Sequence, residues 1–166
     1  MPAERAALQS ESMALVTVAQ ALHWIDRSAF YGEVRRVLVA GGVIAVWSYG
    51  LGQFGDPAID GAIAEFYATT VGPYWPPERA AVDEGYARIE FPFREVPAPP
   101  VAMEARWTFE QLAGYLSTWS AVRRARTATG VDPLPEFLAR LAPMWGRSSS
   151  PRTIAWPLAI CVGRVE

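Results

Sequence analysis

The sequence predicts an α/β fold built on a doubly wound parallel sheet, and its first third carries that prediction. Residues 13–19 form a short apolar, β-branched run, which is typical of a buried parallel strand. An amphipathic segment follows, and residues 43–47 form a second apolar run. Strand, helix and strand within about 35 residues make one right-handed parallel crossover, the unit from which doubly wound sheets are built.

The helix of this crossover has a predicted start, buried stripe and end. Asp26 is placed to cap its first turn, and Gly41-Gly42 is expected to end it. The apolar positions that fall on one stripe are Phe30, Val34, Val37 and Leu38. The spacing therefore predicts a helix that covers one face of the sheet.

A second predicted helix begins at Asp56-Pro57, a capping residue followed by a proline in the first turn. Its buried side is expected to comprise Ile59, Ile63, Phe66, Tyr67 and Thr70. Gly72-Pro73 should stop it, and the prolines at 73, 76 and 77 indicate an irregular aromatic loop around Tyr74 and Trp75.

The C-terminal half contains two further helices. Thr108 and Gln111 form a capping box, and the stripe that follows is Leu112, Tyr115, Leu116 and Trp119. Asp132-Pro133 opens a shorter helix that Pro143 and Gly146 should end. Its inward positions are expected to be Phe137, Leu138 and Leu141.

Prolines limit the strands of this half. Because Pro92, Pro97, Pro99 and Pro100 interrupt residues 91–100, any strand there should be an edge strand, and residues 101–107 are the more regular candidate. Residues 153–165 indicate a terminal strand with a bulge or an unpaired position at Pro157.

Composition narrows the classes of protein and partner. The 166 residues are 51% hydrophobic, which suits a single domain over 1–166 with a normal core. Fifteen basic and 17 acidic residues without blocks of like charge give no reason to expect nucleic acid or a membrane surface as partner. The single cysteine, Cys161, and the absence of a signal-peptide pattern fit a cytoplasmic protein, and one histidine with one cysteine disfavours a metal site.

Residues 15–26, Leu-Val-Thr-Val-Ala-Gln-Ala-Leu-His-Trp-Ile-Asp, together with 33–38 and 41–43, resemble the class I S-adenosylmethionine-dependent methyltransferases. The group that looks most similar is the type 11, trans-aconitate methyltransferase-like branch. Ala14 and Ala40 depart from that pattern, where the family usually has aspartate and proline.

The resemblance implies a Rossmann-like sheet in strand order 3-2-1-4-5-7-6, of which this chain holds strands four to seven with their flanking helices. It therefore implies a partial domain without the glycine-rich turn after strand one and the acidic residue after strand two. S-adenosylmethionine is the implied cofactor. The cofactor residues that carry over are Ala3, Glu4, Ala19 and Gln20.

The acceptor is expected to be a small molecule, with residues 50–126 forming the acceptor or cap region. Its candidate lining residues are Tyr49, Trp75, Trp107, Trp119 and Arg123. The aromatic residues could equally form a hydrophobic cap. Arg123, with the neighbouring arginines, could pair with a carboxylate substrate or lie at a solvated helix end.

His23 is the candidate catalytic residue, because it follows a strand whose carboxyl end faces the ligand crevice. It could act as a general base or shape the pocket. The alternative is a structural histidine packed against Trp24. Methyl transfer needs alignment and exclusion of water more than a dedicated base.

Without strands one to three, Met13–Ala19 becomes a sheet edge, which predicts self-association or an N-terminal partner there. Two functions stay open at this point. The chain is part of a methyltransferase that needs the cofactor loop from elsewhere, or it is a truncated, non-enzymatic remnant or interaction module.

Overall fold

The computed structural model describes residues 2–166, and their contacts divide the chain into two compact units. The sheet unit comprises the described residues up to Gly50, with Glu78–Val101 and Pro157–Glu166. The helical unit comprises Leu51–Pro77 and Ala102–Trp156. Each unit has its own hydrophobic core.

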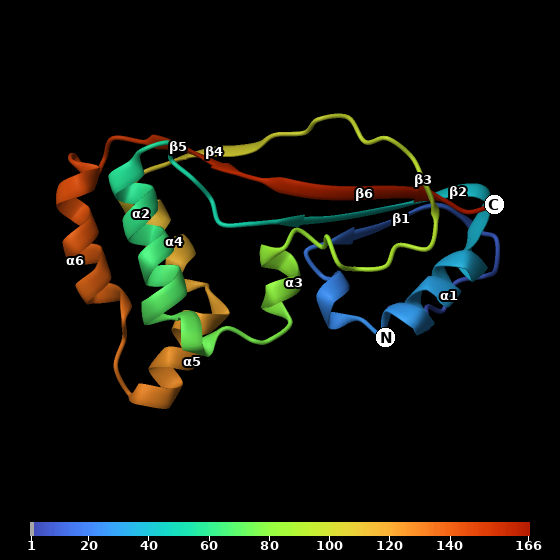
Figure 1. Ribbon diagram of the computed structural model, residues 1–166, viewed down its shortest axis with the longest axis horizontal. Coiled ribbons are helices and arrows are strands. Elements are labelled where there is room, and N and C mark those ends of the chain that lie inside the picture. Colours follow the sequence, from blue (N-terminus) through green and yellow to red (C-terminus); the bar gives the residue numbers. More distant parts are fainter. Residues whose placement is uncertain (1) are drawn as a thin grey trace. The chain divides into compact units, whose positions relative to one another are not determined.

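Four strands form the sheet of the sheet unit: β1 (Met13–Ala19), β2 (Leu38–Tyr49), β3 (Arg94–Glu95) and β6 (Leu158–Arg164). Their spatial order is β1-β2-β6-β3 (Figure 1). β1 is parallel to β2, whereas β6 is antiparallel to both of its neighbours. This is the order 4-5-7-6, so the expected α/β sheet of strands four to seven is confirmed.

The sixth strand of that order is β3, and not the segment predicted for it. β3 has only two residues, as expected of an edge strand in a proline-rich segment. Residues 101–107 do contain a strand, β4 (Met103–Trp107), but it pairs with β5 (Arg152–Trp156) in the helical unit. The sequence therefore predicted where a strand lies in this segment, but not the strand with which it pairs.

Three helical segments belong to the sheet unit: η1 (Leu22–Trp24), α1 (Arg27–Val37) and α3 (Arg79–Asp83). The predicted cap is confirmed, because the backbone N–H of Ala29 donates to Oδ1 of Asp26 at 3.2 Å. The core joins one face of the strands to α1 and to the α3 region; its members include Val18, Phe30, Val34, Ile44, Val46, Val82 and Tyr86. The sequence analysis did not predict α3.

The glycine pair after α1 does not end the helix. α1 stops at Val37, and Leu38, which is buried, already belongs to β2. Gly41 has a φ of 75°, and a Cβ on Gly42 would lie 2.8 Å from the Val39 carbonyl oxygen. The pair instead makes an irregularity inside β2, where the pairing with β1 shifts register.

β1 has the predicted bounds but not the predicted burial. Of its seven residues only Val18 is buried, and Leu15 is 55% exposed. The physical reason is that β1 forms an edge of the described sheet, with a neighbour on one side only.

The helical unit contains α2 (Pro57–Glu65), α4 (Phe109–Ser117), α5 (Ser120–Thr129) and α6 (Leu134–Trp145), with the β4–β5 ribbon (Figure 1). The predicted N-terminal caps at Asp56 and Thr108 are confirmed, and α6 begins at Leu134, directly after the predicted Asp132-Pro133. Oδ1 of Asp56 accepts from the N–H groups of Ala58 and Ile59, and Thr108 with Gln111 forms the capping box.

Several boundaries in the helical unit differ from the prediction. α2 continues into a π-helical turn, η2 (Phe66–Thr70), which leaves Thr70 exposed. A 3-10 turn, η3 (Gly72–Tyr74), follows in the aromatic loop. Pro143 lies inside α6, which ends at Gly146 with a φ of 81°.

The predicted C-terminal strand is two strands. Pro157 separates β5 from β6, and these strands belong to different sheets. Because proline cannot donate a ladder hydrogen bond, the chain changes sheets where pairing is already interrupted.

Candidate functional site

The carboxyl ends of β1 and β2 define the candidate site. The two strands are parallel, so the chain leaves both of them at the same edge of the sheet. Open α/β sheets bind ligands at this edge. β1 ends at Ala19 and is followed by Gln20, and β2 ends at Tyr49. His23 lies in η1, directly beyond β1.

Gln20 ties these two strand ends together. Its Oε1 accepts a hydrogen bond from the Tyr49 backbone N–H at 2.9 Å, and its Nε2 donates to the Tyr49 carbonyl oxygen at 3.3 Å. The Gln20 backbone N–H donates to the Trp47 carbonyl oxygen at 2.9 Å. Gln20 also has a left-handed φ of 51°, which is uncommon for a residue other than glycine. Such strained positions concentrate at functional sites.

His23 pairs with Tyr86. Its Nδ1 lies 2.9 Å from the Tyr86 hydroxyl oxygen, and its ring also contacts Trp24 at a centroid distance of 4.7 Å. Burial lowers the pKa of His23 below its ordinary value of 6.5, and the nearby Arg79 guanidinium lowers it further against the opposing effect of Glu78. At neutral pH the imidazole is therefore uncharged.

Tyr86 is the residue of this edge that the sequence analysis missed. It is 4% exposed and has a left-handed φ of 60°. Burial raises the pKa of its hydroxyl above the ordinary value of 10.0, and the nearby backbone amides of His23 and Leu22 oppose this shift. Tyr86 lies 63 residues from His23 along the chain, and no local pattern joins the two.

The four residues that the family resemblance gives as cofactor contacts all lie in the sheet unit. They differ in how many of their polar groups are already hydrogen-bonded within the protein. Ala3 and Ala19 are exposed. Oε1 of Glu4 accepts from the Asp26 backbone N–H at 3.1 Å. Tyr49 uses both polar atoms of the Gln20 side-chain amide, and Trp47 uses the Gln20 backbone N–H, so the Gln20 carbonyl oxygen is the group left for a ligand.

Of the candidate acceptor residues, Tyr49 lies in the sheet unit and the others lie in the helical unit. Trp75 and Trp119 are in contact at 5.6 Å, and Trp107 joins them through Tyr115, at 5.0 Å and 5.9 Å from Trp107 and Trp119 respectively. The structure therefore gathers the three predicted tryptophans into one aromatic cluster. Arg123 is exposed on α5, a helix that was predicted only as the end of the preceding one.

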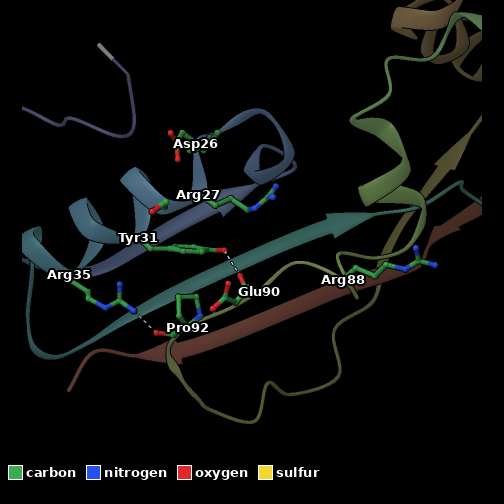
Figure 2. A pocket seen from close by; sticks show the side chains of 9 residues that line it. Asp26, Arg27, Tyr31, Arg35, Arg88, Glu90 and Pro92 are labelled. Atoms are coloured by element: carbon green, nitrogen blue, oxygen red, sulfur yellow. Dashed lines mark hydrogen bonds between the residues drawn. The ribbon is translucent and has the colours of Figure 1, made fainter.

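A groove of about 700 Å³ runs beside α1 in the sheet unit. Figure 2 shows Tyr31 and Arg35 reaching from α1 to the segment of Glu90 and Pro92, where they donate to the carbonyl oxygens of these residues at 3.0 Å and 2.6 Å. Asp26, also in the groove, caps α1. Because the chain itself uses these polar groups, the strand ends are the stronger site candidate despite the size of the groove.

Within residues 2–166, no cluster of three or more His, Cys, Asp or Glu side chains is arranged to hold a metal ion. Over the same residues, no helix combines the length and apolarity needed to cross a membrane.

The sheet order and the strand-end site define a class I methyltransferase type of α/β protein. A solved structure from Anaeromyxobacter dehalogenans, described as a type II methyltransferase, is 42% identical, with a TM-score of 0.89 over 99% of this chain and 69% of its own. The chain belongs to the class I S-adenosylmethionine-dependent methyltransferase family.

Other comparisons give the extent of the match. A curated Dictyostelium discoideum protein that carries the name of a methyltransferase is 34% identical to this chain over 137 residues. These residues are 81% of this chain and 52% of the length of that protein. The chain thus spans about half of that relative. A Bacillus halodurans structure has 15% identity and a TM-score of 0.42 over 99% of this chain and 69% of its own, too remote for argument. No protein-family model matches the chain.

Proposed function

We propose that this chain takes part in methyl transfer from S-adenosylmethionine to a small-molecule acceptor, at the carboxyl ends of β1 and β2. The observation that carries the proposal is the Gln20–Tyr49 connection, which fixes the backbone at these strand ends. Family membership supports the same reaction class.

The residues at this edge fit one wall of a cofactor site. Ala19 is exposed and has a small side chain, so a ligand could approach the backbone that Gln20 holds in place. Glu4 keeps one carboxylate oxygen beyond the one bonded to Asp26. A bound cofactor would supply an electrophilic methyl group on its sulfonium. The chain's contribution would be to orient reactants and exclude water.

The aromatic cluster of the helical unit supports an apolar or flat acceptor. Trp75 and Trp107, which are half-buried, would provide contact area at low conformational cost, whereas Trp119 is 8% exposed and belongs to the core behind them. Arg123 is exposed and would suit a carboxylate group of an acceptor. Replacing Trp75 with alanine should raise the KM of the transfer reaction for such an acceptor more than it lowers kcat.

One wall buries only part of a ligand, and tight binding needs most of the ligand surface covered. We therefore expect residues 1–166 to need the glycine-loop half of the family fold before they bind the cofactor tightly. Calorimetric titration with S-adenosylmethionine tests this. Weak or absent binding by the chain alone, restored by the part of the Anaeromyxobacter relative that the chain does not match, is the expected result. No binding after that addition would contradict the proposal.

A second candidate, an interaction module without cofactor binding, rests on the exposed β1 edge and Leu15. This function predicts that the added fragment binds to the chain but that S-adenosylmethionine then produces no heat. The same titration series therefore separates the two candidates.

A further inference from the structure

The hydroxyl of Tyr86 has a single proton, and the atoms around it determine where that proton goes. Tyr86 is 4% exposed, so its hydroxyl proton needs an acceptor inside the protein. Within residues 2–166, the acceptor observed at hydrogen-bond distance is Nδ1 of His23, at 2.9 Å. A neutral imidazole has one donor nitrogen and one acceptor nitrogen, so Nδ1 can accept the Tyr86 proton.

The charge state of both groups supports this arrangement. Burial raises the pKa of the Tyr86 hydroxyl, which keeps its proton at neutral pH. Burial and Arg79 lower the pKa of His23, which keeps the ring uncharged despite Glu78. If Nδ1 accepts, the ring proton must be on Nε2.

We infer that Tyr86 is a positioning residue that holds His23 as the Nε2–H tautomer, and that His23 is a hydrogen-bond donor to a carboxylate oxygen of the ligand. With its proton on Nε2, the ring has no free basic nitrogen to take a proton from an acceptor. Of the roles that the sequence left open for His23, this excludes the general base and makes His23 a recognition residue. The assignment of a ligand rests on the proposed function, whereas the tautomer does not.

The surroundings of His23 favour an anionic oxygen. Arg79 and Glu78 act on the ring with opposite charges, Arg79 with the larger effect, and the His23 side chain is only half-buried. Within residues 2–166, no hydrogen bond to Nε2 is observed. A donor beside a positive charge suits a carboxylate, which could come from the amino-acid part of the cofactor or from the methyl acceptor.

The tautomer can be read directly, because His23 is the single histidine of the chain. In ¹⁵N-labelled protein at neutral pH, two-bond ¹H–¹⁵N correlations should place the proton on Nε2 and show Nδ1 as a hydrogen-bond acceptor. Tyr86→Phe should move the Nδ1 resonance to that of an unbonded nitrogen. Tyr31→Phe is the matched control, since Tyr31 is another buried tyrosine whose hydroxyl donates elsewhere, to the Glu90 carbonyl oxygen.

A proton on Nδ1 in the wild-type protein would overturn the inference, and so would an unchanged Nδ1 resonance in Tyr86→Phe. The wild-type spectrum alone decides the tautomer if the Tyr86 variant does not fold.

The source of the carboxylate is tested on the chain with its complementing fragment. The probes are S-adenosylhomocysteine, methylthioadenosine, which lacks the carboxylate, and succinate. A shift of the Nε2–H resonance with S-adenosylhomocysteine but not methylthioadenosine assigns the donor to the cofactor, and a shift with succinate assigns it to the acceptor. His23→Ala should then weaken that probe's binding about 10-fold or more. His23→Gln, whose amide nitrogen can replace Nε2, should restore most of it.

The possible failures are distinguishable. Binding of S-adenosylhomocysteine by calorimetry without a shift of Nε2–H by any probe would reject the donor role and leave the proposed function intact. Failure of S-adenosylhomocysteine to bind would count against the proposed function, while the tautomer measurement on the free chain would stand.

Discussion

Gln20 and Tyr49 are joined by two hydrogen bonds between one side chain and one backbone unit, with lengths of 2.9 Å and 3.3 Å. They lie 29 residues apart, at the ends of adjacent parallel strands. η1 begins two residues after Gln20, so the same hydrogen bonds help to fix the position of His23 relative to Tyr86.

Gln20→Asn should destabilise the protein by about 1–3 kcal/mol, since it removes two hydrogen bonds of about 0.5–1.5 kcal/mol each. Asparagine tolerates the left-handed conformation, so the loss reports the bonds and not backbone strain. Urea unfolding measures the change. Gln9→Asn is the control, because Gln9 is exposed in the same unit, and equal effects of the two variants would contradict the assigned role.

Glu33 should make the protein acid-sensitive. Hydrogen bonds from Arg36, together with the Ala6 backbone N–H, lower the pKa of Glu33 from 4.5 to about 2. The folded state thus favours the carboxylate, so this stabilisation is complete above pH 4.5 and is lost as the pH falls toward 2. Glu33→Gln should make the free energy of unfolding depend less on pH across that window.

Urea titrations at several pH values test the Glu33 prediction. Glu104→Gln is the control, since the Glu104 side chain is exposed and makes no hydrogen bond or ion pair observed within residues 2–166. A wild-type acid dependence that Glu33→Gln leaves unaltered would show that this carboxylate is not its source.

Gly163 on β6 should not tolerate a side chain. A Cβ there would lie 2.5 Å from Cβ of Phe93 and 2.8 Å from the Phe91 ring, and a Cβ so near the backbone cannot swing aside. Gly163→Ala should cost about 1–3 kcal/mol. Gly32→Ala, inside α1 with open space around it, should instead stabilise by about 0.5–1 kcal/mol. Shifts of the same sign in thermal unfolding would contradict this reasoning.

The β1 edge should drive self-association of the isolated chain. Leu15 is 55% exposed on this strand, whose outer side has no strand neighbour in the described sheet. Light scattering should give a mass that rises above the monomer with concentration. Leu15→Lys should lower that mass, whereas Leu8→Lys, at a 43% exposed leucine outside the strand, should not. A wild-type monomer at every concentration would rule the idea out.

Local signals in the sequence predicted local structure well. The Asp26 cap, the Asp56-Pro57 start and the Thr108–Gln111 capping box are all present, because each joins residues two or three positions apart. The prediction that Gly41-Gly42 ends the helix was wrong, because it too considered near neighbours only. Glycine pairs end helices and also permit irregular strands, and only the pairing of β2 with β1 selects the second use.

The candidate site divides in the same way. The position of Gln20 and His23 after a strand was predictable from the run that precedes them. The partners of both residues, Tyr49 and Tyr86, were not, because they come from distant segments. Whether the carried-over residues bind a cofactor stays a prediction.

The sequence by itself determined the first parallel crossover and the helix starts, since these follow from side-chain spacing and from capping chemistry between near neighbours. It also indicated the family, through the resemblance of residues 15–43 to known methyltransferases. The tertiary structure alone decided that β3 and not β4 completes the sheet, that Pro157 separates two strands of different sheets, and that Tyr86 meets His23. These outcomes depend on which distant segments pair and pack, and hydrogen bonding between strands imposes no fixed spacing along the chain.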